Sequence, residues 1–185
     1  MIYVIDHEDS FTYNLVHLLE GFGPTYVSNY FDINWQKLKR SKIIIFSPGP
    51  GNPSHYRETQ KVYKKYKGNK KIIGICLGFQ QILYAENANI VPQKKIYHGY
   101  QSKIKVLKES ALFKPNKVFL VGRYHSLKLK EPFNSSSLKI TMRCIESNVA
   151  MAIEDTINNV YGFQFHPDSF LTDDGKFLIQ KIIQF

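Results

Sequence analysis

One cysteine stands between two glycines in a pattern that can create a nucleophile. Gly74-Ile75-Cys76-Leu77-Gly78 follows an apolar run of strand length and precedes residues that suit a helix. In a nucleophile elbow, the reactive side chain sits on such a sharp strand-to-helix turn, and flanking glycines remove side chains that would collide across it. A sulfur at a helix N-terminus is also favoured as the thiolate. Taken alone, this stretch predicts either a nucleophile or a cysteine buried in a strand.

A cysteine nucleophile needs a base, a group that orients the base, and donors for the oxyanion. Among the six histidines, His166 ends an apolar run and is followed by proline. Asp168 lies two residues further on and is the right type of side chain to orient an imidazole. Backbone N–H groups of Leu77 and of the Gly49-Pro50-Gly51 loop are candidate oxyanion donors. The alternatives are an ordinary loop histidine and a surface carboxylate.

These residues must be positioned by strands and helices. The order of strand-like and helix-like segments along the chain predicts an α/β fold with a mostly parallel, twisted sheet and helices on both faces. Strands are expected at 2–5, 25–30, 42–46 and 71–75, and helices at 11–21, 56–67 and after the cysteine. Further along the chain, added antiparallel strands are expected at 96–100, 102–107, 117–121, 138–145 and 149–154, then a strand at 161–165 and a helix at 174–185. Because sites lie beyond the carboxyl ends of parallel strands, the 47–53 loop and the cysteine turn should share one edge.

Composition narrows the class of protein. The 185 residues, 43% hydrophobic and 22% charged, predict a single domain over 1–185. The two cysteines, Cys76 and Cys144, exclude a disulfide framework and fit the cytoplasm, with Cys144 expected in the core. No signal peptide or membrane span is expected. The net charge of +10 comes from scattered lysines, so we expect no nucleic-acid partner, and no histidine spacing predicts a metal site.

The order of several motifs carries a family resemblance over essentially the whole chain. The chain resembles the class I, triad-type glutamine amidotransferases, in particular the small subunits of anthranilate synthase and aminodeoxychorismate synthase. The matching stretches are Asp9-Ser10-Phe11-Thr12-Tyr13-Asn14-Leu15, Ser47-Pro48-Gly49-Pro50-Gly51, Gly74-Ile75-Cys76-Leu77-Gly78, His98-Gly99, Arg123-Tyr124-His125-Ser126-Leu127 and Gly162-Phe163-Gln164-Phe165-His166-Pro167.

This resemblance implies a flavodoxin-like architecture and a glutaminase. Cys76 would attack the side-chain amide of L-glutamine, His166 would move the proton, and Asp168 would hold His166. Oxyanion donors would be the N–H groups of Leu77 and Gly51. The glutamine would be cradled by Gly49, Pro50, Gly51, Gln80, Ser126 and Leu127.

The resemblance also implies a partner. Ammonia would pass to a separate synthase subunit that uses chorismate, with His98 and Gly99 facing that subunit. No cofactor is expected in this chain, while the synthase would use Mg²⁺. Whether the product serves tryptophan or folate synthesis is left open by the sequence.

Two residues depart from the family pattern. Phe79 replaces the histidine of Cys-Leu-Gly-His-Gln, and Asp168 replaces the glutamate of His-Pro-Glu-Ser. The shorter aspartate would lengthen its hydrogen bond to the imidazole unless the backbone shifts. These departures keep two rival hypotheses open: a weakly active or non-catalytic regulatory subunit of the same fold, and a cysteine acyl hydrolase or peptidase.

Overall fold

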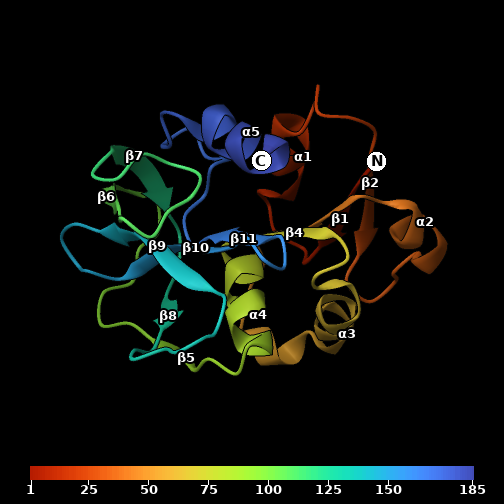
Figure 1. Cartoon of the computed structure of the whole chain (residues 1–185), viewed down its shortest axis with the longest axis horizontal. Coiled ribbons are helices and arrows are strands. Elements are labelled where there is room, and N and C mark those ends of the chain that lie inside the picture. The colour runs from red at the N-terminus through yellow and green to blue at the C-terminus, as the bar shows by residue number, and fades with distance from the viewer.

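The first strand shows how both faces of the sheet come to be covered. Successive side chains of β1 (Ile2–Asp6) point to opposite faces. Ile2 and Val4 belong to one buried cluster, whereas Tyr3 and Ile5 belong to another. In the computed structural model, which describes residues 1–185, these two clusters form the two sides of the hydrophobic core. The alternation therefore predicts helices on both faces, as Figure 1 shows.

Five strands form the parallel half of a nine-stranded sheet, in the order β2-β1-β3-β4-β11. Besides β1, they are β2 (Thr25–Asn29), β3 (Ile43–Phe46), β4 (Lys71–Ile75) and β11 (Val160–Phe163). The register aligns β3, β4 and β11, with Phe46 beside Gly74 and Phe163 beside Ile75. The carboxyl ends of these strands thus meet at one edge, as the sequence predicts.

Antiparallel strands extend the sheet beyond β11 in the order β10-β9-β6-β7. Their bounds are β6 (Tyr100–Val106), β7 (Val118–Arg123), β9 (Lys139–Cys144) and β10 (Ala150–Asp155). A separate two-stranded sheet pairs β5 (Ile90–Pro92) with β8 (Leu127–Leu129). The predicted fold class, a parallel core with antiparallel additions, is confirmed.

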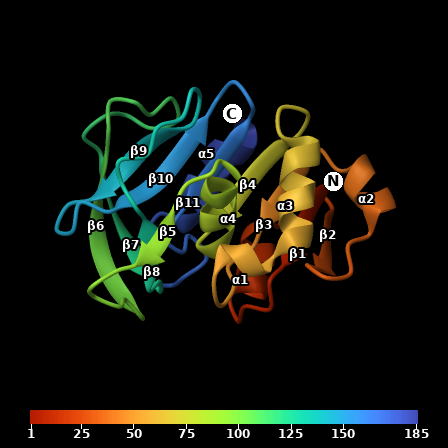
Figure 2. The ribbon, with the colours of Figure 1, turned by 90° about the horizontal axis from the view of Figure 1, so that it is seen from below.

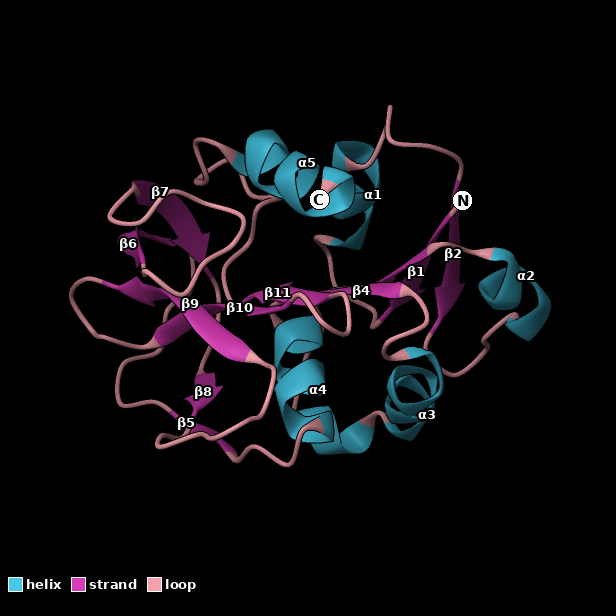
Figure 3. Ribbon diagram, in the orientation of Figure 1, coloured by secondary structure: helices cyan, strands magenta, loops and turns pink.

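Helices cover the two faces in pairs (Figures 1 and 3). On one face lie α1 (Thr12–Leu18) and α5 (Gly175–Gln184). On the other lie α3 (Arg57–Tyr66), which follows the short helix η1 (Pro53–His55), and α4 (Leu77–Ala85). Figure 2 shows α3 and α4 in front of the strands that they cover. None of the helices is both long enough and apolar enough to cross a bilayer.

Several boundaries differ from those expected. Helix α2 (Trp35–Arg40) was not predicted, because Leu38 is its one buried residue and no apolar stripe marks it. Its signal was the cap, where the side chain of Asn34 accepts a hydrogen bond from the N–H of Lys37. The expected strand at 96–100 is wrong: the chain is irregular up to Gly99, and β6 then runs without a break.

Candidate active site

Cys76 occupies a strained turn between β4 and α4. It is the N-cap residue of α4, with φ 52° and ψ −101°, a conformation that few non-glycine residues adopt. A Cβ atom on Gly74 would lie 2.4 Å from the carbonyl oxygen of Gly78, and one on Gly78 would lie 2.1 Å from that of Phe46. Both glycines are therefore required by close packing, which confirms the predicted reason for the glycine spacing.

A chain of amide groups reaches the sulfur of Cys76. The Nε2 atom of Gln80 donates to Oε1 of Gln164 at 3.1 Å. The Nε2 atom of Gln164 lies 3.9 Å from the Cys76 sulfur, a distance suited to a hydrogen bond to sulfur. Such donors favour the charged thiolate. Sequence reasoning assigned no role to Gln164, and only its place in the Phe-Gln-Phe-His run pointed to it.

His166 is buried and held on several sides. Its backbone N–H donates to the carbonyl oxygen of Gly122 at 3.0 Å. Its ring lies 4.9 Å from the ring of Phe11 and 5.0 Å from that of Tyr124, measured between centroids. Burial disfavours the imidazolium, but the nearby Cys76 thiolate and the Asp168 carboxylate outweigh that effect and raise the pKa of His166 to about 10. The protein thus favours a protonated His166.

Asp168 approaches His166 without completing a hydrogen bond. Its Oδ2 atom lies 3.6 Å from Nδ1 of His166, beyond the usual range of about 2.7–3.2 Å. Both side chains are buried, and none of their polar atoms has another hydrogen-bond partner. The structure therefore brings the two residues together, with the longer separation expected for an aspartate in place of a glutamate.

A cavity of about 140 Å³ opens beside Cys76. Its walls include all six residues expected to bind glutamine: Gly49, Pro50, Gly51, Gln80, Ser126 and Leu127. Tyr124 and His125 complete the lining and were not assigned to it from the sequence. These segments are far apart in the chain and meet where β4 and β7 end.

The Gly49-Pro50-Gly51 wall of this cavity is held in place by side chains packed behind it. The hydroxyl of Tyr56 donates to the carbonyl oxygen of Pro50 at 2.6 Å. His7 packs beneath Gly49, where an added Cβ would lie 2.5 Å from the Cβ of His7. The His7 ring contacts Ser47 Oγ at 3.2 Å and Thr59 Oγ1 at 2.9 Å. Burial lowers the pKa of His7 to about 3, so this histidine is a neutral support for the loop.

The opposite wall rests on two buried side chains. Nδ1 of His125 donates to the carbonyl oxygen of Leu127 at 2.7 Å, and Nε2 accepts from Nε of Arg123 at 3.1 Å. Burial and the neighbouring guanidinium lower the pKa of His125 to about 3. Arg123 is itself stacked 3.5 Å from the ring centroid of Tyr97. His125 is thus neutral and fixes the backbone at Ser126 and Leu127.

Backbone donors and the remaining expected residues can also be placed. Leu77 is the first residue of α4, so its N–H has no partner within the helix. The N–H of Gly51 makes no hydrogen bond in the chain. His98 and Gly99 are exposed just before β6, and the His98 ring lies 5.8 Å from that of Tyr124. The expected partner-facing residues are therefore next to the cavity.

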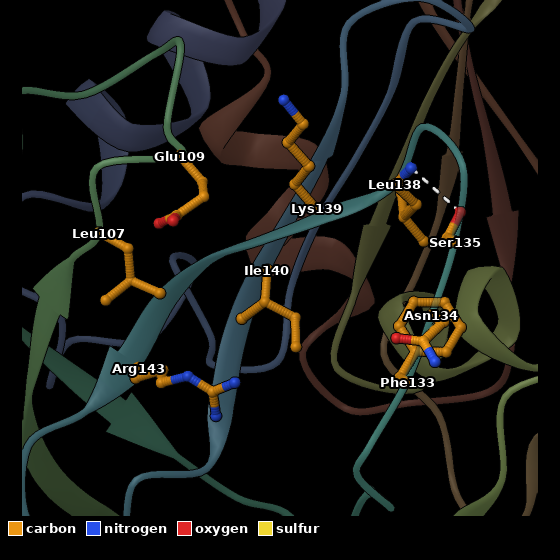
Figure 4. Close-up of a pocket in the computed structure, with 9 residues that line it drawn as sticks. All are labelled: Leu107, Glu109, Phe133, Asn134, Ser135, Leu138, Lys139, Ile140 and Arg143. Carbon is orange, nitrogen blue, oxygen red and sulfur yellow. Dashed lines mark hydrogen bonds between the residues drawn. The ribbon is translucent and has the colours of Figure 1, made fainter.

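A second hollow lacks the chemistry of the first. Figure 4 shows this cavity of about 460 Å³ between β9 and the loops around residues 107–109 and 133–135. Its lining holds no cysteine or histidine. Nowhere in residues 1–185 do three or more His, Cys, Asp or Glu side chains group as metal ligands. The smaller cavity at Cys76 is therefore the candidate active site.

Comparison with known proteins decides the family. The family model described as glutamine amidotransferase class-I matches residues 3–185. The chain belongs to the class-I glutamine amidotransferases. This confirms the resemblance drawn from the motifs.

Two relatives of this glutamine amidotransferase are similar to it over all or nearly all of their length. Anthranilate synthase component 2 of Lactococcus lactis is 35% identical over 186 residues, covering 99% of this chain and 93% of the relative. Anthranilate synthase component 2 of Pyropia yezoensis is 37% identical over 191 residues, covering 100% of both chains. A GMP synthase protein of Thermoplasma acidophilum has a TM-score of 0.84 at 21% identity, covering 99% of this chain and 92% of that chain. This last likeness shows the fold alone.

Proposed function

We propose that this glutamine amidotransferase is the glutaminase subunit of an anthranilate synthase. The main support is that Cys76 and all six residues expected to bind glutamine line the same cavity. Full-length similarity to anthranilate synthase component 2 from two organisms supports the choice of tryptophan over folate synthesis. That similarity also supports association with a synthase component 1, which would use chorismate.

The geometry suggests how hydrolysis would proceed. The Cys76 thiolate attacks the side-chain amide carbon of glutamine, and the N–H groups of Leu77 and Gly51 stabilise the oxyanion. Protonated His166 gives its proton to the leaving nitrogen, so ammonia departs and a glutamyl thioester remains. Neutral His166 then takes a proton from water, which attacks the thioester. Glutamate leaves, and the thiolate and imidazolium are restored.

The donors around the sulfur suit this sequence of steps. Gln164, which is held by Gln80, stabilises the thiolate before attack. We propose that all proton transfers during glutamine hydrolysis are made by residues of this chain. Mg²⁺ would be bound by the synthase. Because the nucleophile must stay reduced, the reducing cytoplasm is the proposed location.

Reconstitution tests this proposal. The chain is combined with anthranilate synthase component 1 from the same organism, chorismate and glutamine carrying ¹⁵N in its side-chain amide. We expect anthranilate that contains the label. Labelled aminodeoxychorismate with the folate synthase and no labelled anthranilate would move the function to folate synthesis. Release of an amine from peptide substrates or of an alcohol from ester substrates, without glutamine hydrolysis, would favour the acyl hydrolase.

A second candidate function is supported by one observation. The 3.6 Å separation between His166 and Asp168 is what a weakly active regulatory subunit would show. Glutamate release measured in the presence of the synthase separates the two. A rate no faster than that of the Cys76→Ser variant would make the chain a binding subunit.

A further inference from the structure

A cavity rich in lysine lies beside the wall formed by Ser126 and Leu127. It has a volume of about 260 Å³, and its lining includes Gln93, Lys94, Lys95, Tyr97, Lys128 and Ser147. Neither aspartate nor glutamate lines it. Glu146, which precedes Ser147 in the chain, is exposed and lies outside the lining. We call this hollow the lysine cavity.

The three lysines of this cavity have no anionic partner in the chain. None of the ion pairs of the structure includes Lys94, Lys95 or Lys128. The Nζ atom of Lys95 lies 5.0 Å from the ring centroids of both Tyr97 and Tyr100, so its charge is held beside a residue of the lining. Like charges gathered in one hollow repel one another and attract an anion that would lie between them.

Arg123 adds a fourth positive charge on the buried side of Tyr97. Its guanidinium is buried and stacks 3.5 Å from the ring centroid of Tyr97. Nη1 donates to the sulfur of Cys144 at 3.4 Å, whereas Nη2 has no hydrogen-bond partner, and no carboxylate pairs with the group. A buried charge without a counter-ion is energetically unfavourable. The positive potential of Arg123 therefore adds to that of the lysines at this cavity.

The lining indicates the chemical class of a ligand. Lysine ammonium groups, the amide of Gln93 and the hydroxyl of Ser147 all donate hydrogen bonds, and lysine binds phosphate and carboxylate oxygens as a point charge. Several neighbouring cations favour a ligand with more than one negative charge. The volume is below the usual range of cavities for drug-sized molecules, so the ligand should be small.

The structure assigns to the lysine cavity a binding site for a small oxyanion with two or more negative charges. A phosphate compound and a polycarboxylate both offer this chemistry, and the two are separated by experiment below. The site is distinct from the cavity at Cys76, because the two linings share no residue.

Gln93 links the lysine cavity to the glutamine cavity. Its backbone N–H donates to the carbonyl oxygen of Ser126 at 2.9 Å, and its side-chain amide donates to the carbonyl oxygen of His125. Lys128 follows Leu127 directly in the chain. An anion held by Gln93 and Lys128 would order the backbone between them. The occupied cavity should therefore lower the KM for glutamine, a consequence that rests on the proposed function.

Calorimetry of the full chain with inorganic pyrophosphate, and separately with citrate, tests the site. Ionic strength is held constant with KCl, because exposed charges are screened by salt. We expect one binding site per chain. Tighter binding of pyrophosphate would support a phosphate compound as the ligand, and tighter binding of citrate would support a polycarboxylate. Absence of binding by both anions would overturn the inference.

Two triple variants separate the cavity from the general positive charge of the chain. The variant Lys94→Gln/Lys95→Gln/Lys128→Gln should bind the preferred anion about tenfold more weakly or worse, since it loses charged hydrogen-bond donors. The control removes the same charge from exposed lysines outside the lining, in Lys39→Gln/Lys105→Gln/Lys176→Gln. It should bind like the parent chain. Equal weakening in both variants would show that net charge alone attracts the anion.

The link to the glutamine cavity has its own measurement. Glutamate release by the complex with the synthase is followed against glutamine concentration, with Mg²⁺ kept in excess of the anion. Saturating anion should lower the KM for glutamine about fivefold, at the low end of the usual range for coupled sites, and change kcat less. The variant that lacks the three cavity lysines should not respond.

The outcomes of the two measurements are independent. An unchanged KM in a chain that binds the anion would overturn the link through Gln93 and leave the site. A chain that binds the anion through its cavity lysines but hydrolyses no glutamine would overturn the proposed function and leave the site. A KM that falls equally in the variant without the cavity lysines would place the effect of the anion elsewhere and overturn the link.

Discussion

Nδ1 of His166 and Oδ2 of Asp168 are 3.6 Å apart in a region closed to solvent, and neither atom has another hydrogen-bond partner. Burying a carboxylate without a hydrogen-bond partner is energetically unfavourable, so a hydrogen bond between these two side chains would stabilise the pair. The pair is therefore a point at which a small movement would form a hydrogen bond.

Replacing Asp168 by alanine should lower turnover while leaving glutamine affinity little changed, since the carboxylate acts on the imidazole. The loss of a triad carboxylate can reach about ten-thousand-fold. A thiolate depends less on base assistance, so we expect roughly ten- to a thousand-fold. Steady-state kinetics of the complex give kcat and KM separately. Asp174→Ala, which removes an exposed carboxylate nearby, is the control.

Replacing Asp168 by glutamate tests the separation itself. The extra methylene should close the gap, and turnover in the complex should match or exceed that of the parent chain. A slower enzyme would show that the backbone is adapted to aspartate. If neither Asp168 variant changes turnover, the site works as a pair of Cys76 and His166.

The charge of His166 should depend on Cys76. Its pKa of about 10 lies above the ordinary 6.5, so protonation stabilises the fold fully below about pH 6.5, and this stabilisation is lost as pH rises toward 10. In Cys76→Ser the thiolate is absent and only Asp168 opposes burial, so the pKa of His166 should fall. NMR titration of the imidazole and unfolding between pH 6.5 and 10 measure both effects. An unchanged titration in Cys76→Ser would contradict the ion pair.

Gly78→Ala should destabilise the turn. The new methyl group would lie 2.1 Å from the carbonyl oxygen of Phe46, which belongs to the neighbouring strand β3. Helix α4 must then move away from the sheet, at a cost of about 3 kcal/mol. Urea unfolding measures the change, and Cys76 labelling should slow in parallel. Stability equal to that of the parent chain would show that the turn is not tightly packed.

Tyr56→Phe should weaken glutamine binding. The hydroxyl holds the carbonyl oxygen of Pro50 at 2.6 Å, and losing one such bond is worth about 1 kcal/mol. If that energy positions the loop, KM rises about fivefold while kcat changes less. Tyr13→Phe, at an exposed tyrosine, is the control. A KM equal to that of the parent chain would mean that the loop is rigid without this bond.

The turn at Cys76 was predictable because its signals are local. Gly74 and Gly78 lie two residues before and after the nucleophile, and close packing requires glycine at both positions. The shared sheet edge also followed, because parallel strands place their carboxyl ends together. Helix α2 was not predicted, because a single buried leucine does not produce the helical periodicity of apolar residues that reveals a helix.

The supports of the site could not be predicted, because they depend on contacts between distant segments. Gln164 reaches Cys76 only because β11 pairs with β4. Tyr124 contacts Phe11 from a distant segment of the chain, and nothing in either local sequence specifies that contact. Burial makes His7 and His125 neutral supports, whereas at His166 the neighbouring Cys76 and Asp168 outweigh burial and keep the ring charged.

The most direct measurement tests whether the sulfur of Cys76 is the nucleophile. The parent chain and Cys76→Ser are mixed with the synthase and supplied with either glutamine or ammonia. Cys76→Ser should lose glutamine-dependent synthesis by a factor on the order of thousands, as when a triad nucleophile is removed. It should keep ammonia-dependent synthesis, and acid quenching of the parent chain during turnover should trap a glutamyl group on Cys76. Glutamate release by Cys76→Ser at a rate comparable to that of the parent chain would contradict the account.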